Sequence, residues 1–453
     1  MKRRSMKRVN VKKENKTFKT LAIATIAGLS IIGVGQAQAA TTLDEVDLSQ
    51  KPIDMPTLDY LHNNDVQIKY EDGTEVAIPQ SNYTMTEVKA NEDGSKPDGD
   101  NIITQYSYDK TTGSLSPLYY EINYQTQFGN PDGDTTLTFG KVNGSWKLNP
   151  ENPTSTITYK YNQGETIDGS ITNDSTSANI ARDFVNINSG SDPLILNKKN
   201  ATISNITGNF IANGSSSFIY ELIDNNGHID NIKGTFAINK TNYGLIYNNE
   251  NATIDKIEGL FVDNSGYAVH NNGGIIKSIL ADFINGSGIS NNYGVITNIV
   301  GSFINSDIEN VGYSNNATIN NIVGDFIGSN INNKGGSIDK IEGTFTNSRD
   351  RAILNQVNDS YANPPLIKLI LADFIANQGG GISNIYGGIT DIIGSFIGNG
   401  GSTEYGNGGA ICNDGLLTIN DNLKKTSYIG NITGTFLNNH VRYRGVQYTI
   451  QGK

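Results

Sequence analysis

A short apolar motif recurs through the second half of the chain and limits the possible folds more than any other feature. It reads Ile-x-x-Ile-x-Gly-x-Phe and is complete at residues 203–210. Later copies end at Phe236, Phe261, Phe283, Phe303, Phe326, Phe345, Phe374, Phe396 and Phe436. A degenerate copy ends at Phe184, and Ala replaces the Gly at Ala281 and Ala372. This regular recurrence predicts a repeat architecture.

A second motif, Ile/Val-x-Asn, lies between copies of the first. Its asparagines are Asn225, Asn248, Asn271, Asn291, Asn310, Asn333, Asn355, Asn384 and Asn413. The length differences between repeats are expected just after Phe-x-x-Asn, which would place the variable loops along one edge of a stack. The longest interval, between Phe396 and Phe436, is expected to hold about two turns, one of them without the first motif.

The repeat length, near 22 residues, favours a parallel β-helix. Helical-hairpin repeats need roughly 33–45 residues. A leucine-rich repeat would instead place Leu at the strand centre and a helix in the next arc, whereas here the centre is Gly and the arcs are rich in Asn, Gly and Ser. We therefore expect an all-β fold in which residues 176–440 form a solenoid of about ten to twelve coils. Alternation along the strand places Ile206, Gly208 and Phe210 inside.

Stacking should align Ile on Ile and Phe on Phe, each buried side chain contributing roughly 1.5–3 kcal/mol. Asn at matched turn positions should form amide ladders along the stack. Asn also tolerates the left-handed backbone of sharp corners. The chain before Phe184 and after Phe436 is expected to cap the exposed strand edges.

Residues 40–175 carry no copy of the repeat and are expected to form a smaller antiparallel β-rich region. Asp72-Gly73 and Asn143-Gly144 each lie between alternating apolar runs, which is typical of a hairpin. Two Pro-Asp-Gly-Asp segments, residues 97–100 and 131–134, are expected to be ordinary β-turns. Calcium binding through their carboxylates is the alternative. Residues 441–453 would be a cap or a truncation.

Residues 1–39 are expected to be a secretory signal peptide. They contain a basic segment, an uncharged apolar run from Leu21 to Gly35, and small residues that predict cleavage after Ala39 or Ala40. A membrane anchor is the alternative reading, but the apolar run is short for a roughly 20-residue span. Removing residues 1–39 leaves 25 basic and 44 acidic residues, a net charge of −19. Such an acidic chain is not expected to bind nucleic acid or anionic lipid.

Phe-x-x-Asn occurs at Phe210–Asn213, Phe374–Asn377, Phe396–Asn399 and Phe436–Asn439, and Gly-Gly-Ala-Ile occurs at residues 408–411. Together these motifs resemble the repeats of polymorphic outer-membrane proteins and related autotransporter passengers, over about residues 177–440. The resemblance implies a right-handed parallel β-helix displayed on a Gram-negative cell surface and used in adhesion. Such proteins end in a membrane β-barrel, for which the residues after Phe436 are too few. Association with the outer membrane would then use a missing barrel or another anchor.

No motif for catalysis, cofactor binding or metal binding stands out. The chain contains no phosphate loop, dinucleotide fingerprint or Gly-x-Ser-x-Gly. Asp282 and Asp325, in the slot before the motif Phe, are the nearest approach to a carboxylate pair, and a solvated polar ladder is the preferred explanation. His270 and Cys412 share the variable position of the second motif and are expected at the surface. A single Cys excludes a disulfide scaffold.

The preferred hypothesis is an exported cell-surface β-helix protein, adhesin-like and without catalysis. Its partner would be a protein or glycan of a host or neighbouring cell. The first alternative is a secreted polysaccharide lyase or glycoside hydrolase on the same scaffold. The second is a structural stalk that presents the N-terminal region.

Overall fold

The computed structural model describes the repeat region and parts of the chain before it. The described residues are 67–69, 75–77, 83–99, 102–109, 114–124, 127–130, 132–143, 145–153, 155–162, 170–176, 178–187, 192–212, 219–312, 317–357, 364–401, 409–414, 416–419, 423–443 and 446–450. The cleavage positions Ala39 and Ala40 lie outside them. Every element in these ranges is a strand, so no described segment is a helix long and apolar enough to cross a membrane.

The chain divides into two units, Met1–Gln80 and Ser81–Lys453. In the first unit the described elements are β1 (Gln67–Lys69) and β2 (Glu75–Ala77), which pair antiparallel with Ile68 opposite Val76. This pairing confirms the hairpin predicted around residues 72–73.

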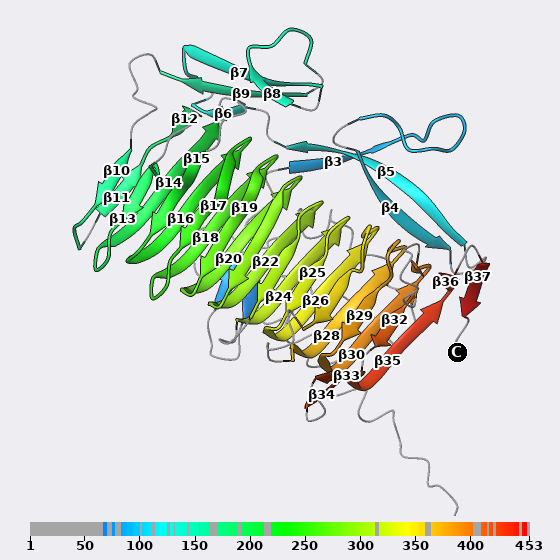
Figure 1. Ribbon diagram of the computed structural model, residues 1–453. Coiled ribbons are helices and arrows are strands. Elements are labelled where there is room, and N and C mark those ends of the chain that lie inside the picture. Colours follow the sequence, from blue (N-terminus) through cyan, green and yellow to red (C-terminus); the bar gives the residue numbers. More distant parts are fainter. Residues whose placement is uncertain are drawn as a thin grey trace, which may run out of the picture. The chain divides into compact units, whose positions relative to one another are not determined.

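The second unit contains a parallel β-solenoid of about nine turns, which confirms the predicted fold class with slightly fewer turns than expected. Each turn contributes one long and one short strand, and both pair in parallel with their counterparts in the next turn (Figure 1). The long-strand sheet consists of β11 (Ala178–Ala181), β14 (Thr202–Ala212), β16 (His228–Ala237), β18 (Thr253–Val262), β20 (Ile275–Ile284), β22 (Val295–Ile304), β24 (Thr318–Ile327), β26 (Ser337–Thr346), β28 (Leu366–Ile375), β30 (Gly388–Ile397) and β35 (Tyr428–Leu437), with β12 (Phe184–Ile187) paired to β14. The short-strand sheet consists of β10 (Ile171–Asn173), β13 (Ile195–Asn197), β15 (Ile219–Asn225), β17 (Lys240–Asn248), β19 (Ser265–Asn272), β21 (Ser287–Asn292), β23 (Ile308–Val311), β25 (Ile331–Lys334), β27 (Ile353–Gln356), β29 (Ile382–Ile385) and β32 (Ile411–Asp414).

The first motif forms the long strands, and its apolar side chains fill the solenoid. Phe rings stack without interruption from Phe184 to Phe436, with centroids 4.4–5.1 Å apart in neighbouring turns. This spacing is that of hydrogen-bonded strands. The two Ile of each motif from Ile203 to Ile392 lie beside the rings in the same buried cluster, whereas Ile432 of the last copy is 46% exposed. Period-2 alternation thus places Ile206 and Phe210 inside as predicted, whereas Gly208 between them is only half-buried.

Gly at the strand centre is required by the close approach of the turn below. A Cβ added at Gly234 would lie 1.9 Å from the carbonyl oxygen of Gly208, and at Gly324 it would lie 2.1 Å from that of Gly301. No side chain fits at such distances unless the backbone shifts. The Gly of the motif is therefore a packing requirement.

Where the central residue is not Gly, the residue after it is Asp. Arg182, Ala281 and Ala372 precede Asp183, Asp282 and Asp373. These carboxylates accept the backbone N–H of the next turn, from Asn209 at 2.7 Å, Ser302 at 3.0 Å and Ser395 at 2.9 Å. The Ala of β20 and β28 also drops out of the pairing with the following strand. We infer that the carboxylate supplies the acceptor that the shifted backbone no longer provides.

The Asn of the second motif form the amide ladder that was predicted. Each side-chain nitrogen donates to the amide oxygen of the next Asn at 2.7–2.9 Å, from Asn173 to Asn413. The same nitrogens reach backbone carbonyls at the start of the long strands, for example Ser337 from Asn310. The ladder therefore ties the short-strand sheet to the long-strand sheet.

A second ladder follows the motif Phe, at the last position of Phe-x-x-Asn. Asn239, Asn377 and Asn399 each donate to the amide oxygen of the corresponding Asn in the next turn. Ser306 and Ser329 take this place in the middle turns. The preceding residue has a left-handed backbone in most turns. It is usually Asn or Gly, but it is Asp263 at φ 50° and Ile238 and Ala376 at φ 52°. Asn at corners was predicted, whereas this Ile and this Ala were not.

Two details of the repeat prediction are wrong. The interval between Phe396 and Phe436 holds no extra turn, because β30 pairs directly with β35. Its additional residues include an antiparallel hairpin of β33 (Leu416–Ile419) and β34 (Leu423–Thr426). This hairpin lies between a short and a long strand, as does the interval between β27 and β28. Insertions therefore occur in both arcs.

Two antiparallel-rich sheets precede the solenoid, as predicted for residues 40–175. The first has the order β3 (Tyr83–Val88), β5 (Ser114–Tyr124), β4 (Ile102–Asp109). The second has the order β6 (Gln127–Gly129), β9 (Ser155–Tyr161), β7 (Thr135–Val142), β8 (Ser145–Leu148). Val142 and Ser145 pair across the predicted Asn143-Gly144 turn.

Both sheets touch the solenoid. The Tyr159 hydroxyl donates to Asp183 of the first turns, Lys141 forms an ion pair with Asp263 at 3.7 Å, and β4 contacts β24. At the C-terminal end β36 (Asn439–Tyr443) pairs with β31 (Gly400–Gly401) and with β37 (Val446–Ile450). The strands after Phe436 thus continue the ordered structure beyond the last long strand.

Candidate functional site: an aromatic face on the short-strand sheet

Aromatic side chains gather on three consecutive short strands. Tyr220 lies on β15, Tyr243 and Tyr247 lie on β17, and Tyr267 and His270 lie on β19. We call these five residues the tyrosine face; their strands are neighbours in the sheet (Figure 1). Tyr247 and His270 occupy the same register position in successive turns. The solenoid thereby turns residues more than twenty apart in sequence into neighbours.

The rings form a continuous series. Centroids are 5.5 Å apart between Tyr220 and Tyr243, 6.2 Å between Tyr243 and Tyr247, and 4.9 Å between Tyr247 and His270. Tyr267 packs edge-on to His270 at 5.6 Å. Tyr220 is 44% exposed and Tyr243 is 46% exposed, which is unusual for such large side chains. The outer end of the series is therefore open to solvent, and the inner end is packed.

His270 is buried, at 9% exposure, so the prediction of a surface residue is wrong for it. Its Nε2 lies 3.1 Å from the Asn292 amide nitrogen, which donates, and its Nδ1 lies 3.3 Å from the Tyr243 carbonyl oxygen. These partners place the ring proton on Nδ1 of a neutral imidazole. Burial lowers the pKa of His270, which agrees with the neutral form. His270 is thus a packing element between tyrosines.

Carboxylates border the tyrosine face on both sides. On one side Glu309 accepts a hydrogen bond from the Tyr267 hydroxyl at 2.6 Å and from Lys334 at 2.8 Å. Burial alone would raise the pKa of Glu309, but these two donors lower it, so the group is ionised. Burial and the bond to Glu309 raise the pKa of Tyr267. The hydroxyl therefore remains protonated and acts as a donor.

On the other side lie Glu221 and Asp224, both on β15. Burial and the nearby Asp224 charge raise the pKa of Glu221 to about 7. Burial also raises the pKa of Asp224, against the opposing effect of donors from Asn226 and Asn249. Near neutral pH this edge therefore holds a carboxyl group that can either donate or accept a proton.

Side chains at the position directly before the motif Phe are more buried than predicted. A solvated ladder was expected there, yet Asp325 is 5% exposed and Asp373 is also buried. Burial raises the pKa of Asp282 and Asp373 to about 6 and that of Asp325 to about 7. Contact between β4 and β24, the strand of Asp325, explains part of this covering. Asp325 cannot meet a substrate from solvent, which argues against a catalytic Asp282–Asp325 pair.

Among the described residues, neither Cys412 nor the Pro-Asp-Gly-Asp segments form part of a binding site. Cys412 is half-buried on β32. At the second Pro-Asp-Gly-Asp segment, the Gly133 N–H donates to the Asn130 carbonyl at 2.9 Å, which is the hydrogen bond of a β-turn. Asp98 and Asp132 are exposed.

Sequence reasoning missed the tyrosine face because it treated the middle residue of Ile/Val-x-Asn as an unconstrained position. Tyr247 and His270 fill that position in consecutive turns, while Tyr220 and Tyr243 lie outside both motifs. Comparison of aromatic residues between adjacent repeats would have revealed part of the cluster.

No known protein family matches the chain, and neither a curated protein nor a solved structure matches it significantly.

Proposed function

We propose that this chain is an exported β-solenoid protein that binds a glycan on its tyrosine face and does not catalyse a reaction. The observation that carries the proposal is the pair of adjacent exposed rings, Tyr220 and Tyr243, bordered by carboxylates. Tyr combines an apolar ring face with a hydroxyl at low cost in conformational entropy, which suits binding at a partly wet surface. Carboxylates accept hydrogen bonds from sugar hydroxyls.

A glycan fits this face better than an acidic or a strongly basic partner. The carboxylates would repel anionic chains, and the chain as a whole has a net charge of −11. The ionised Glu309 is already paired with Lys334, so one of the charges that would attract a basic partner is neutralised. A neutral ligand rich in hydroxyl groups can stack on the tyrosine rings and donate hydrogen bonds to the carboxylates.

Export and surface display belong to the proposal and rest on the sequence. The basic segment and apolar run of residues 1–39 support secretion, and the Phe-x-x-Asn repeats support a surface role by resemblance to autotransporter passengers. Fractionation of the producing cells with an antibody against the repeats tests this part. Protein found in the cytoplasm with an intact N-terminus would contradict it.

Binding is tested by affinity electrophoresis of the mature chain in gels that contain single purified polysaccharides. Tyr220→Ala and Tyr243→Ala should each weaken retardation at least tenfold, because stacking area is lost while the fold is kept. Tyr428→Ala is the matched control, since Tyr428 is equally exposed, at 51%, but lies on a long strand. Equal retardation of all three variants and the parent chain would overturn the proposal.

A second function, glycan cleavage, would have to use Glu221, whose pKa is raised to about 7 by burial and by Asp224 but whose side chain is only 7% exposed. Glycan cleavage uses a protonated carboxyl group as general acid and a second carboxylate. Incubation of a bound polysaccharide with the chain should release no reducing ends if the protein only binds. Release that is abolished in Glu221→Gln would assign the chain to glycoside hydrolysis instead.

A further inference from the structure

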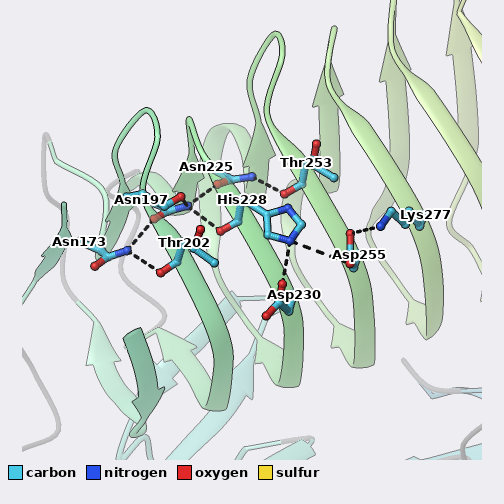
Figure 2. A network of polar contacts seen from close by, with 10 residues as sticks. Asn173, Asn197, Thr202, Asn225, His228, Asp230, Thr253, Asp255 and Lys277 are labelled. Atoms are coloured by element: carbon cyan, nitrogen blue, oxygen red, sulfur yellow. Dashed lines mark hydrogen bonds and ion pairs between the residues drawn. The ribbon is translucent and has the colours of Figure 1, made fainter. Parts of the chain in front are cut away.

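Three potential metal ligands meet on the outer surface of two adjacent turns, away from the short strands of the tyrosine face. His228 begins β16, Asp230 follows two residues later, and Asp255 lies on β18. The His228 Nε2 lies 2.7 Å from Asp230 Oδ1 and 3.9 Å from Asp255 Oδ2. One ligand atom from each residue lies within 4.8 Å of the other two. Figure 2 shows the imidazole directed between the two carboxylates.

The repeat register brings these residues together. Ile229 pairs with Ile254, so Asp230 and Asp255 occupy the same position in consecutive turns. Strand spacing near 4.8 Å then places the two carboxylates next to each other. His228 reaches them from the start of the same strand. The arrangement is thus set by the stacking of the turns.

The asparagine ladder holds the backbone beneath the cluster. The Asn197 side chain donates to the His228 carbonyl at 3.0 Å, and the Asn225 side chain donates to the Thr253 carbonyl at 3.1 Å (Figure 2). Both strands therefore start at a defined position. The side chains themselves are about a third to a half exposed, which leaves them free to adjust and to share a cation with water.

Two neighbouring carboxylates need a compensating cation. Lys277, in the next turn, lies 2.7 Å from Asp255 Oδ1 and neutralises that side. The other oxygen of Asp255 and the Asp230 carboxylate still face each other across the imidazole. No cation from the described residues pairs with Asp230 except His228 itself, if protonated.

We infer that His228, Asp230 and Asp255 bind a divalent transition-metal ion, with Zn²⁺ as the reference case. Zn²⁺ binds His nitrogen and carboxylate oxygen at about 2.0–2.2 Å, so ligand atoms around it lie within about 4.2 Å of one another. The present ligand atoms lie within 4.8 Å of one another, at most about 0.6 Å beyond that limit. Three protein ligands leave a coordination position for water. The imidazole favours Zn²⁺ over Mg²⁺ and Ca²⁺, which prefer oxygen ligands.

The chain contains its own control for this site. Ser337, Asp339 and Lys368 stand at the positions equivalent to His228, Asp230 and Asp255, because Ile338 pairs with Ile367. There Lys368 lies 2.7 Å from Asp339 and completes an ordinary ion pair. This second position lacks the imidazole and the second carboxylate, so it should not bind metal.

The test is calorimetric titration of the mature, untagged chain with ZnCl₂ near pH 7.5. The His228→Ala and Asp255→Asn variants should each bind one equivalent of Zn²⁺ less than the parent chain, or bind that equivalent with at least tenfold lower affinity. Ser337→Ala and Asp339→Asn should retain that equivalent. Circular dichroism of the metal-free variants establishes that they are folded. Unchanged Zn²⁺ stoichiometry and affinity in folded His228→Ala would overturn the inference.

Two further variants test the ligand assignment in the opposite direction. Ser337→His combined with Lys368→Asp rebuilds the same triad at the second position and should add one equivalent of Zn²⁺. Lys277→Ala removes the competing ammonium and should tighten binding at the first position several-fold. A folded Ser337→His, Lys368→Asp chain that gains no equivalent would contradict the assignment of these three ligands.

Discussion

At the scale of single residues, the tight contact between turns decides which residue the strand centre accepts. Gly234 and Gly324 face equally close carbonyl oxygens, yet the residues after them differ, Thr235 in one case and Asp325 in the other. The natural Ala-Asp pairs at 281–282 and 372–373 indicate that a carboxylate in this place compensates for a side chain at the centre. The two glycines should therefore differ in their tolerance of Ala.

Gly234→Ala should destabilise the solenoid by about 3 kcal/mol or more, because its Cβ would overlap backbone. Gly324→Ala should cost clearly less, because Asp325 stands at the position of Asp282 and Asp373 and pairs in register with Thr344, whose N–H it would accept once the backbone shifts. Adding Thr235→Asp to Gly234→Ala should recover part of the loss. Urea unfolding of the three variants measures these differences. If the two single variants lose equal stability, the compensating role of the Asp is wrong.

At the scale of elements, the asparagine ladder links the two sheets of the solenoid. Asn310 is fully buried, and its side chain donates to Asn333, to the Ala317 carbonyl and to the Ser337 carbonyl. Removal of this side chain would leave buried acceptors without partners. A buried polar group left without a hydrogen-bond partner lowers the free energy of unfolding by about 1–3 kcal/mol, whereas removal of a solvent-exposed amide lowers it little.

Asn310→Ala should therefore lower the free energy of unfolding by about 2–4 kcal/mol. Asn332→Ala, one residue before the next ladder member, is the control and should cost less than about 0.5 kcal/mol. Denaturant unfolding and amide hydrogen exchange of the neighbouring turns provide the measurement. Equal stability of the two variants would show that the ladder adds nothing to folding.

Asp282, Asp325 and Asp373 each precede the motif Phe, and burial raises the pKa of all three carboxyl groups. The free energy of unfolding should therefore depend on pH. The pKa of Asp325 is about 7 in the folded chain, far above the ordinary value of 3.8, because of burial and the nearby Asp282. The folded state thus keeps a proton that the unfolded state releases between about pH 4 and 7. Stability should fall as pH rises through this window and level off above it.

Asp325→Asn imitates the protonated carboxyl group and should flatten this decline. At pH 8 the variant should be more stable than the parent chain by up to about 4 kcal/mol, the equivalent of a three-unit pKa shift. Near pH 4 the two should differ little. Thermal unfolding across pH 4–8 gives the comparison. Parallel pH profiles for the two proteins would contradict a protonated Asp325 in the folded state.

At the scale of the whole molecule, the sequence predicted the solenoid, its inner Phe and Ile rows and its Asn ladder, because these depend only on the repeat and on strand alternation. It did not predict which outward positions are covered. Asp325 and His270 lie on outward positions of their strands but are buried by residues distant in sequence, which a single-repeat pattern does not contain. For the same reason the sequence did not predict the cluster of His228, Asp230 and Asp255, whose members come from two adjacent turns.

The proposed function was likewise predictable only in outline. The basic and apolar segment of residues 1–39 and the repeats suggested a surface binding protein, but the proposed ligand face depends on which aromatic side chains meet across turns. The tyrosine face crosses three neighbouring turns, from Tyr220 on β15 through Tyr243 and Tyr247 on β17 to Tyr267 and His270 on β19. An extended ligand should therefore contact several turns at once.

Titration calorimetry with a length series of one bound oligosaccharide tests the account most directly. Affinity should rise as the oligosaccharide becomes long enough to reach from Tyr220 to Tyr267, then level off. Tyr243→Ala, in the middle of the row, should remove most of the gain with length. Affinity that is independent of length, or a length dependence that persists in folded Tyr243→Ala, would contradict a glycan-binding face built across the turns of the solenoid.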